Sequence, residues 1–328
     1  MNDRFFANGE SIVVPVQVDQ ANDSIIPWAV AMAKLLDKKI RLIHVVQPWV
    51  QIPSSLNYGE GTVLVSLKDA IQSSIRDQAE QDLQGLCRRF PGDVEVGYKI
   101  REGHIVDCIV AEAIEDHTSF ILMSLGPPRN HRVWLEGLST PFSVMALAPV
   151  PVMVVPPHAV EPDLNANLKI LLADDLRPHT EAALKESFDL LTLLNKAELH
   201  YVHVCDLDEG QIRFALERGE RRFLEKISPH LCVDDILQDT CRRLEDKMTR
   251  RLEQNVVHHG LAKMKCLQKV LVGDIAQQLK NYIRHESPDI LVFGRHHALH
   301  QRPFSLGRLP YRMMLEHNRP IFVIPNSE

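Results

Sequence analysis

The chain alternates short apolar runs with longer segments whose apolar residues recur every three or four positions. A short apolar run bounded by turn residues predicts a buried strand, and the longer spacing predicts a helix. In the first half, the predicted strands cover residues 12–18, 40–46, 94–100, 120–124 and 151–155. The predicted helices cover residues 25–36, 67–90 and 105–114, with a short helix before the last strand. This alternation predicts an α/β fold, with a parallel sheet and helices on both of its faces.

The same pattern starts again after a stretch of prolines and polar residues, 156–165. Such a composition marks a domain boundary. We therefore expect a first domain over residues 1–157, a linker over residues 158–167, and a second domain over residues 168–328.

Matching positions in the two halves are separated by a nearly constant number of residues. The matched pairs are Ile12 and Ile170 (158 apart), His44 and His203 (159 apart), Gly103 and Gly273 (170 apart), and Pro151 and Pro320 (169 apart). A near-constant separation with one step of about 11 residues indicates a tandem duplication. The step is an enlarged segment, residues 206–260, which is rich in charge and predicted to be mostly helical. A solvated helix face is the plain interpretation of this segment, and a surface that binds a partner is the alternative.

Composition narrows the class of protein. A length of 328 residues suits roughly two domains of about 100–200 residues each. A formal net charge of -6 argues against general nucleic-acid binding. No apolar run reaches the roughly 18 residues of a membrane span, and the N-terminus lacks the apolar core of a signal peptide. The six cysteines form no Cys-x-x-Cys pair, so we expect reduced thiols, no bound metal and a cytoplasmic location.

The ordered set of features, present twice, resembles two universal stress protein domains in one chain. The set comprises the opening apolar strand, the strand that holds His44 or His203, the glycine before a helix, the glycine loops, and the closing strand between prolines. The resemblance covers about residues 11–156 and 168–325. It implies a stress-response protein whose two domains have the three-layer, Rossmann-like fold of the adenine nucleotide alpha hydrolases. Each domain would contain a five-stranded parallel sheet.

The resemblance also implies how the domains assemble. Family domains pair through their last strands, here about residues 151–155 against residues 320–324. One chain would then imitate the family's usual dimer, and a homodimer of the whole chain is a further expectation. Protein partners are expected, whereas nucleic-acid and membrane partners are not.

Members of the family that bind ATP resemble one another in a loop of the form Gly-x2-Gly-x9-Gly-Ser/Thr. They also carry an acidic residue after the first strand, which holds the ribose. Glycines admit phosphate close to the backbone, and the last pair meets it at a helix N-terminus. In the second half the spacing survives as Gly294, His297, Gly307 and Arg308, with Asp175 at the acid position. Val204 lies where an apolar residue would pack on adenine.

The predicted nucleotide site is therefore in the second half. Its residues are Ala173, Asp174, Asp175, Val204, Phe293, Gly294, His297, Gly307, Arg308 and Leu309. Within this set, Asp174 is expected to be a solvated turn residue. Two alternatives remain open: Gly294 and Gly307 merely turn the chain into its helix, and Asp175 caps the following loop.

The first half has lost most of this pattern. Gln17 replaces the acid, and the loop positions become Ser124, Pro127, Gly137 and Leu138. A shifted alignment uses Gly126 or Ser139 instead. The two prolines at 127–128 stiffen a loop that would have to curl around phosphate.

The remaining histidines have simpler interpretations. His44 and His203 lie in apolar strands and are expected to be core histidines with one hydrogen bond each. A structural or solvent role is also expected for the group His296, His297 and His300, rather than a metal site.

The leading hypothesis is a non-catalytic module that binds ATP or a related nucleotide in its second domain and signals. The alternatives are a family member that acts through protein contacts without nucleotide, and a slow ATPase.

Overall fold

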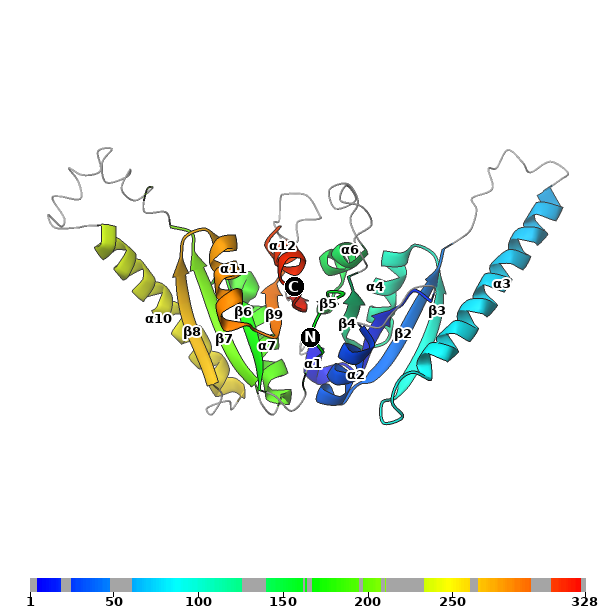
Figure 1. Cartoon of the computed structure of the whole chain (residues 1–328), viewed down its shortest axis with the longest axis horizontal. Coiled ribbons are helices and arrows are strands. Elements are labelled where there is room, and N and C mark those ends of the chain that lie inside the picture. The colour runs from blue at the N-terminus through cyan, green and yellow to red at the C-terminus, as the bar shows by residue number, and fades with distance from the viewer. Residues whose placement is uncertain are drawn as a thin grey trace. The chain divides into compact units, whose positions relative to one another are not determined.

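Five parallel strands form the centre of each of two units of the chain, Met1–Pro162 and Asp163–Glu328 (Figure 1). The computed structural model describes residues 5–18, 25–47, 61–125, 140–161, 163, 167–194, 197–207, 210, 233–259, 265–295 and 308–325.

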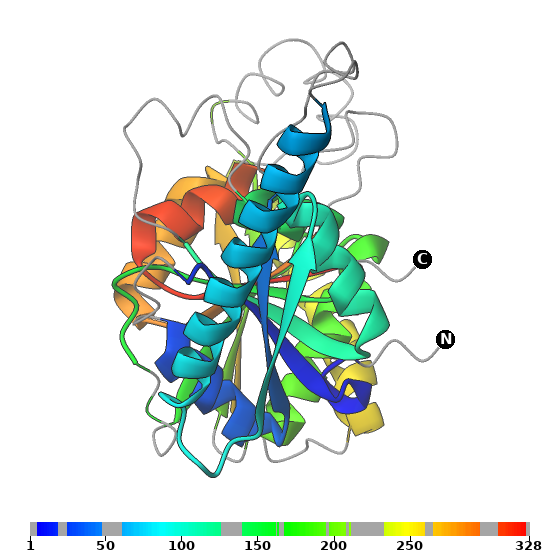
Figure 2. The same cartoon turned by 90° about the vertical axis from the view of Figure 1, so that its right-hand side faces the viewer.

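The first unit has its strands in the order β3-β2-β1-β4-β5. Their bounds are β1 Ser11–Pro15, β2 Lys39–Val46, β3 Val96–Glu102, β4 Thr118–Ser124 and β5 Val152–Val155. The helices are α1 Phe5–Asn8, α2 Ile25–Leu36, α3 Gly61–Cys87, α4 Ile105–Glu115 and α6 Thr140–Leu147. Helix α3 lies along β2 and β3 at one edge of the sheet (Figure 2).

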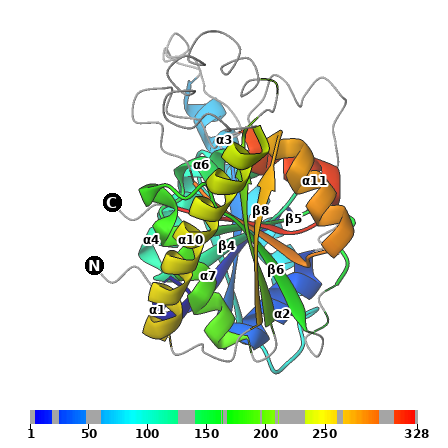
Figure 3. The ribbon, with the colours of Figure 1, turned by 90° about the vertical axis from the view of Figure 1, so that its left-hand side faces the viewer.

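The second unit repeats this arrangement, with the strand order β8-β7-β6-β9-β10. The strands are β6 Leu168–Ala173, β7 Ala197–Cys205, β8 Lys265–Val272, β9 Ile290–Gly294 and β10 Ile321–Ile324. The helices are η2 Pro178–Thr180, α7 Glu181–Leu193, α10 Val233–His259, α11 Ile275–Glu286 and α12 Arg308–His317. Helices α7 and α10 pack side by side on one face of the sheet (Figure 3), and α11 packs against α12 on the other.

The predicted α/β fold with two five-stranded parallel sheets is confirmed, and the differences concern element ends. The first strand ends at Pro15 rather than at residue 18. Strand β8 is an edge strand that begins at Lys265, and its exposed residues are Lys265, Leu267 and Lys269. Helix α3 begins at Gly61 rather than at residue 67.

The enlarged segment of the second half does not have a longer helix than its counterpart. Both α3 and α10 contain 27 residues. The extra residues therefore precede α10, and most of them lie outside the described part of the chain.

The two matched glycines have a backbone conformation that side chains disfavour. Gly103 has φ +142° and Gly273 has φ +120°. Each follows an edge strand and precedes a helix, so the chain can turn sharply there only with glycine. This requirement explains why the glycine recurs in both halves.

Burial follows the strand order. The side chains of β5 and β10 are all buried, as are those of β1, β4 and β9 except at their last residue. The edge strand β3 is half-buried or exposed throughout. Within the described residues, no helix combines the length and apolar character needed to cross a membrane.

Candidate functional site

The carboxyl ends of β6 and β9 mark the point where the strand order of the second unit reverses. The chain runs from β6 to β7 on one side, and β9 pairs with β6 on the other side. Open α/β sheets bind ligands at such a point. Ala173 is in register with Phe293, so Asp174 and Asp175 leave the sheet beside Gly294. The structure thus brings together five of the predicted site residues.

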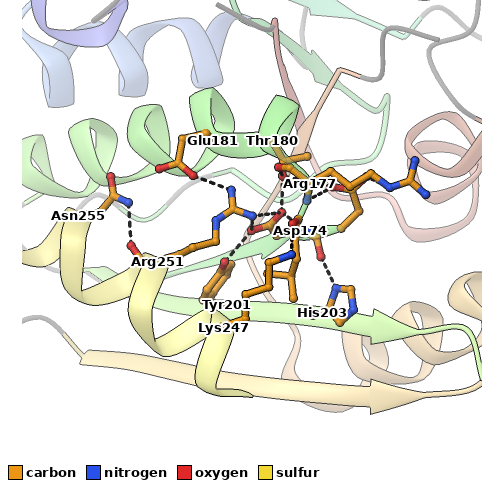
Figure 4. A network of polar contacts seen from close by, with 11 residues as sticks. Asp174, Arg177, Thr180, Glu181, Tyr201, His203, Lys247, Arg251 and Asn255 are labelled. Atoms are coloured by element: carbon orange, nitrogen blue, oxygen red, sulfur yellow. Dashed lines mark hydrogen bonds and ion pairs between the residues drawn. The ribbon is translucent and has the colours of Figure 1, made fainter. Parts of the chain in front are cut away.

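Asp174 is buried at the centre of a polar network, and the expectation of a solvated turn residue was wrong (Figure 4). Its Oδ1 accepts a hydrogen bond from the Leu176 backbone N–H at 2.8 Å and lies 2.5 Å from the Thr180 hydroxyl. Its Oδ2 accepts from the Tyr201 hydroxyl at 2.6 Å and lies 3.2 Å from Arg251 Nη1. A buried carboxylate needs this number of donors because it has left water.

The cation of this network comes from α10. Arg251 is 9% exposed, and its Nη2 lies 2.9 Å from Glu181 Oε2 on α7. One turn earlier, Lys247 Nζ donates to the Leu176 carbonyl oxygen at 2.7 Å. Helix α10 is therefore joined to α7 by an ion pair and to residues 174–177, called here the β6–α7 loop, by two further contacts.

The Tyr201 hydroxyl is a donor because it cannot readily ionise. Burial raises its pKa, and the neighbouring Asp174 carboxylate raises it further. The phenol therefore stays protonated and keeps donating to Asp174.

The two matched histidines make the same contact in both units. His203 Nδ1 donates to the Asp174 carbonyl oxygen at 2.8 Å, and His44 Nδ1 donates to the Val16 carbonyl oxygen at 3.0 Å. Each bond ties the second strand of a unit to the residue that follows the first. The expected structural hydrogen bond is confirmed for both histidines, but only His203 is buried in the core, whereas His44 is half-buried.

Asp175 is partly accessible, with 31% of its side chain exposed. Its Oδ1 accepts from the Arg177 backbone N–H at 3.0 Å and lies 3.2 Å from the Thr180 hydroxyl. The loop-capping contact is thus present, and it fixes the direction of a carboxylate that solvent still reaches. Thr180 is the N-cap residue of α7, but its hydroxyl makes no capping bond and is directed to these carboxylates.

Leu176 has a strained backbone, with φ +60°. A left-handed conformation costs a residue with a side chain roughly 1–2 kcal/mol, and it persists where surrounding contacts determine it. Here Asp174 holds the N–H of Leu176 and Lys247 holds its carbonyl oxygen, while the side chain is buried. Val18, the matching residue of the first unit, has no positive φ.

Gly294 has a packing reason to be glycine. A Cβ added there would lie 3.2 Å from Thr180 Cγ2 and 3.3 Å from Ala183 Cβ. The start of α7 therefore packs directly on the end of β9. This contact accounts for the glycine without any phosphate.

The other predicted site residues are placed as follows. Val204 lies in β7 and is half-buried, and Phe293 is buried in β9. Arg308 and Leu309 begin α12. His297 and Gly307 lie outside the described residues, as do His296 and His300. In the first unit, Ser124 ends β4, and the loop positions Gly126, Pro127, Gly137, Leu138 and Ser139 also fall outside.

The sequence did not reveal the partners of Asp174. Arg251 lies in a helix with several arginines, and no pattern separates it from its neighbour Arg250. A weak signal was available in Tyr201, which lies two residues before the recurring His203 and therefore on the same face of β7.

A second buried cluster lies on the opposite face of β7, since alternate strand residues face opposite ways. His200 Nδ1 lies 2.9 Å from the Tyr282 hydroxyl of α11, and Nε2 lies 3.2 Å from Glu198 Oε1. Lys265 Nζ lies 2.8 Å from Glu198 Oε2. Burial lowers the pKa of His200, although Glu198 opposes the shift. Burial raises the pKa of Tyr282 to about 12. The cluster is thus a neutral histidine beside a charged pair.

No group of three or more His, Cys, Asp or Glu side chains in the part of the chain that the structure describes is arranged to hold a metal ion.

Comparison with known proteins gives a family and a fold. The sequence profile of the Universal stress protein family matches residues 10–156. No curated protein sequence matches the chain. A universal stress protein from Archaeoglobus fulgidus superposes with a TM-score of 0.59 at 14% identity, covering 99% of this chain and 98% of that chain. A functionally unknown protein from Pseudomonas aeruginosa PAO1 superposes with a TM-score of 0.58 at 12% identity, covering 98% of this chain and 94% of that chain.

At these identities the structural likeness concerns the fold alone, and it extends over both units. The family assignment rests on the sequence-profile match, which covers the first unit. Residues 10–156, in the first unit, therefore match the universal stress protein family, and the second unit repeats the fold of the first in tandem.

Proposed function

We propose that the chain is a stress-response module whose second unit binds ATP or a related adenine nucleotide and performs no fast chemistry. The binding site would lie at the carboxyl ends of β6, β7 and β9. The observation that carries this proposal is the position of Asp175. Its carboxylate is held in one direction by the Arg177 N–H, is 31% exposed, and stands at the reversal point of the strand order.

A fixed, accessible carboxylate suits the two hydroxyls of a ribose, which donate to its oxygens. The half-buried Val204 at the end of β7 suits an adenine face, and the N-terminus of α12 suits an anion. In the first unit Gln17 stands at the acid position, and an amide binds ribose hydroxyls more weakly than a carboxylate does. The proposal therefore assigns the ligand to the second unit alone.

We propose no fast chemistry because of the hydrogen bonds that Asp174 already accepts. Both of its oxygens already accept from donors, namely the Leu176 N–H, the Thr180 and Tyr201 hydroxyls, and Arg251. A carboxylate occupied in this way is a poor general base, since that role needs a lone pair directed at the substrate. Phosphate release measured with excess ATP tests this part, and a rate that depends on Asp175 would support the slow-ATPase alternative.

The binding proposal is tested on the purified chain. Mass spectrometry after denaturation shows whether a nucleotide is carried along, and thermal unfolding with added ATP, ADP or AMP shows whether one binds. We expect ATP to raise the melting temperature of the wild-type chain, and Asp175→Ala to remove most of that rise. The matched control is Gln17→Ala in the first unit, which should keep the full rise. A wild-type chain with no bound nucleotide and no response to all three nucleotides would contradict the proposal.

A second candidate function, contact with a protein partner, is favoured by α10. Over residues 233–247 no side chain of this helix is fully buried, although Ile236, Leu237 and Leu244 follow a helical spacing. Association through this surface, including formation of a homodimer, would be weakened by Leu237→Asp with Leu244→Asp. Sedimentation of the wild-type and variant chains distinguishes the associated form from the single chain.

A further inference from the structure

We propose that Lys247 and Arg251 are positioning residues, which couple the placement of Asp175 in the β6–α7 loop to the docking of α10. The proposal rests on the proposed function for the identity of the ligand. It goes further in naming the residues through which ligand binding and α10 affect each other.

The first argument is the spacing of the contacts. Lys247 and Arg251 are four residues apart on α10, so they lie on one helix face. Lys247 holds the Leu176 carbonyl oxygen at 2.7 Å, and Arg251 holds the Asp174 carboxylate at 3.2 Å. A single turn of α10 therefore holds the residues on both sides of Asp175. Figure 4 shows both side chains reaching the loop from α10.

The second argument is the strained conformation of Leu176. Its φ of +60° is maintained by bonds at both ends of the residue, one to Asp174 and one to Lys247. A strained backbone relaxes when one of the contacts that determine it is removed. Because Asp175 directly precedes Leu176, relaxation of Leu176 changes the direction of the Asp175 carboxylate.

The third argument comes from the first unit, where Val16 stands at the position of Asp174. Arg76 of α3 pairs with Glu102 at the end of β3, with 3.3 Å between Arg76 Nη1 and Glu102 Oε1. Val16, which follows β1, is a buried apolar residue with no charge to offer a helix. An ion pair like that between Arg251 and Asp174 is thus specific to the unit that retains the acid.

Coupling of this kind is reciprocal. If α10 must be docked for Asp175 to point at a ligand, then a ligand on Asp175 favours the docked helix by the same factor. Lys247 and Arg251 lie where the exposed part of α10 meets the core, since the fully buried residues of the helix begin at Met248. Binding at the loop would therefore restrain the helix where its exposed part begins.

The test in the absence of ligand is hydrogen exchange of the full chain, followed at the Leu176 amide. Lys247→Met keeps the aliphatic stem and removes the donor, whereas Lys247→Arg keeps a donor. The matched control is Arg250→Met. Arg250 Nε donates to the Asp246 carbonyl oxygen within its own helix. The free energy of a hydrogen bond from a charged donor is enough to change an exchange rate by about tenfold or more. We expect Leu176 to exchange about tenfold faster in Lys247→Met and close to wild type in Lys247→Arg and Arg250→Met.

The test with ligand uses ATP as the probe on the same four chains. We expect Lys247→Met to bind ATP about tenfold more weakly than wild type. We also expect ATP to slow amide exchange across residues 245–255 in wild type and Arg250→Met, but much less in Lys247→Met. A merely structural lysine would lower stability without changing this response. Arg251→Met is the second variant, with the larger expected effect, and Lys247→Met keeps the test valid if that chain does not fold.

The outcomes separate the two proposals. If ATP binds wild type and Lys247→Met equally well, the coupling is wrong while nucleotide binding stands. If ATP affects none of the chains, the proposed function is wrong, and with it the coupling to nucleotide. The positioning of the loop is then decided by the ligand-free exchange, where equal rates for Leu176 in Lys247→Met and Arg250→Met would overturn it.

Discussion

The two units share their strand order and their structural histidine, yet the residues beneath the ligand edge differ completely. In the first unit the positions are apolar, with Val16 after β1 and Leu42 in β2, both buried. In the second unit the matching residues are Asp174 and Tyr201, and Arg251 joins them from α10. The same backbone thus encloses an apolar centre in one copy and an ionic network in the other.

The first unit places its own buried charge elsewhere. Glu112 of α4 is fully buried and lies 2.9 Å from Lys99 Nζ and 2.7 Å from Arg101 Nη2, on the strand β3. The matching residue of the second unit is Tyr282, which meets His200 instead. The comparison teaches that the apolar period of the strands specifies the fold, while buried polar groups can be exchanged so long as each finds partners.

The largest expected effect tests whether the ionic network is essential to the second unit. Asp174→Ala leaves Arg251 and Tyr201 without their shared acceptor, and breaking a buried ion pair costs about 3–5 kcal/mol. The matched change Val16→Ala in the first unit removes apolar contact only and should cost about 1–2 kcal/mol.

The two units can be followed separately during urea unfolding. All three tryptophans, Trp28, Trp49 and Trp134, lie in the first unit, so fluorescence reports that unit while far-UV circular dichroism reports both. Equal losses of unfolding free energy for the two variants would show that the network contributes no more than apolar packing.

The next prediction concerns replacement of the ionic network by apolar side chains like those of the first unit. Asp174→Val combined with Arg251→Met removes both charges and keeps volume, and such replacements of buried ion pairs are often neutral or stabilising. We expect the double variant to be more stable than Asp174→Ala by about 1–3 kcal/mol, measured by the same titration. A double variant less stable than Asp174→Ala would mean that the two units are not interchangeable at this place.

A smaller effect concerns the strain at Leu176. At this left-handed position glycine should be more stable than alanine by about 1 kcal/mol, because alanine retains the Cβ that opposes positive φ. Leu176→Gly and Leu176→Ala both lose the buried side chain, so their difference isolates the backbone. At Leu172, within β6, the order should reverse, with alanine the more stable. If alanine is also favoured at position 176, the strain is not a feature of the second unit.

The smallest effect is a dependence of stability on pH. Burial lowers the pKa of His200 and of His317, both in the second unit. Below the unfolded pKa of about 6.5 the unfolded chain therefore binds more protons, and stability falls as pH falls through that value. We expect a lower unfolding free energy at pH 5 than at pH 7, and a flatter dependence in His200→Gln. An unchanged dependence in that variant would assign the effect to other groups.

Much of the fold was readable from the sequence because buried parallel strands are continuous apolar runs. Residues 120–124 were recognised in this way and lie in β4. Strand β8 was less readable, since an edge strand carries polar residues such as Lys265 and Lys269. Gly103 and Gly273 were recognised as a recurring pair before a helix, and the structure added their positive φ.

The candidate site was less readable. The sequence singled out Asp175 and Gly294 and placed them at the correct strand ends. It assigned Asp174 to solvent, because two adjacent aspartates after a strand look alike until their surroundings are known. For Gly294 it left phosphate binding and a simple turn open, and the structure adds close packing against Thr180 and Ala183.

The sequence by itself determined the duplication, the succession of strands and helices along the chain, and the acid that survives in one copy only. These follow from local apolar periods and from spacings along the chain. Only the tertiary structure decided which aspartate is buried, which arginine pairs with it, and that α10 reaches the β6–α7 loop. Asp174 and Arg251 are 77 residues apart, and packing brings them together when α10 crosses back over the sheet, so no local pattern encodes the pair.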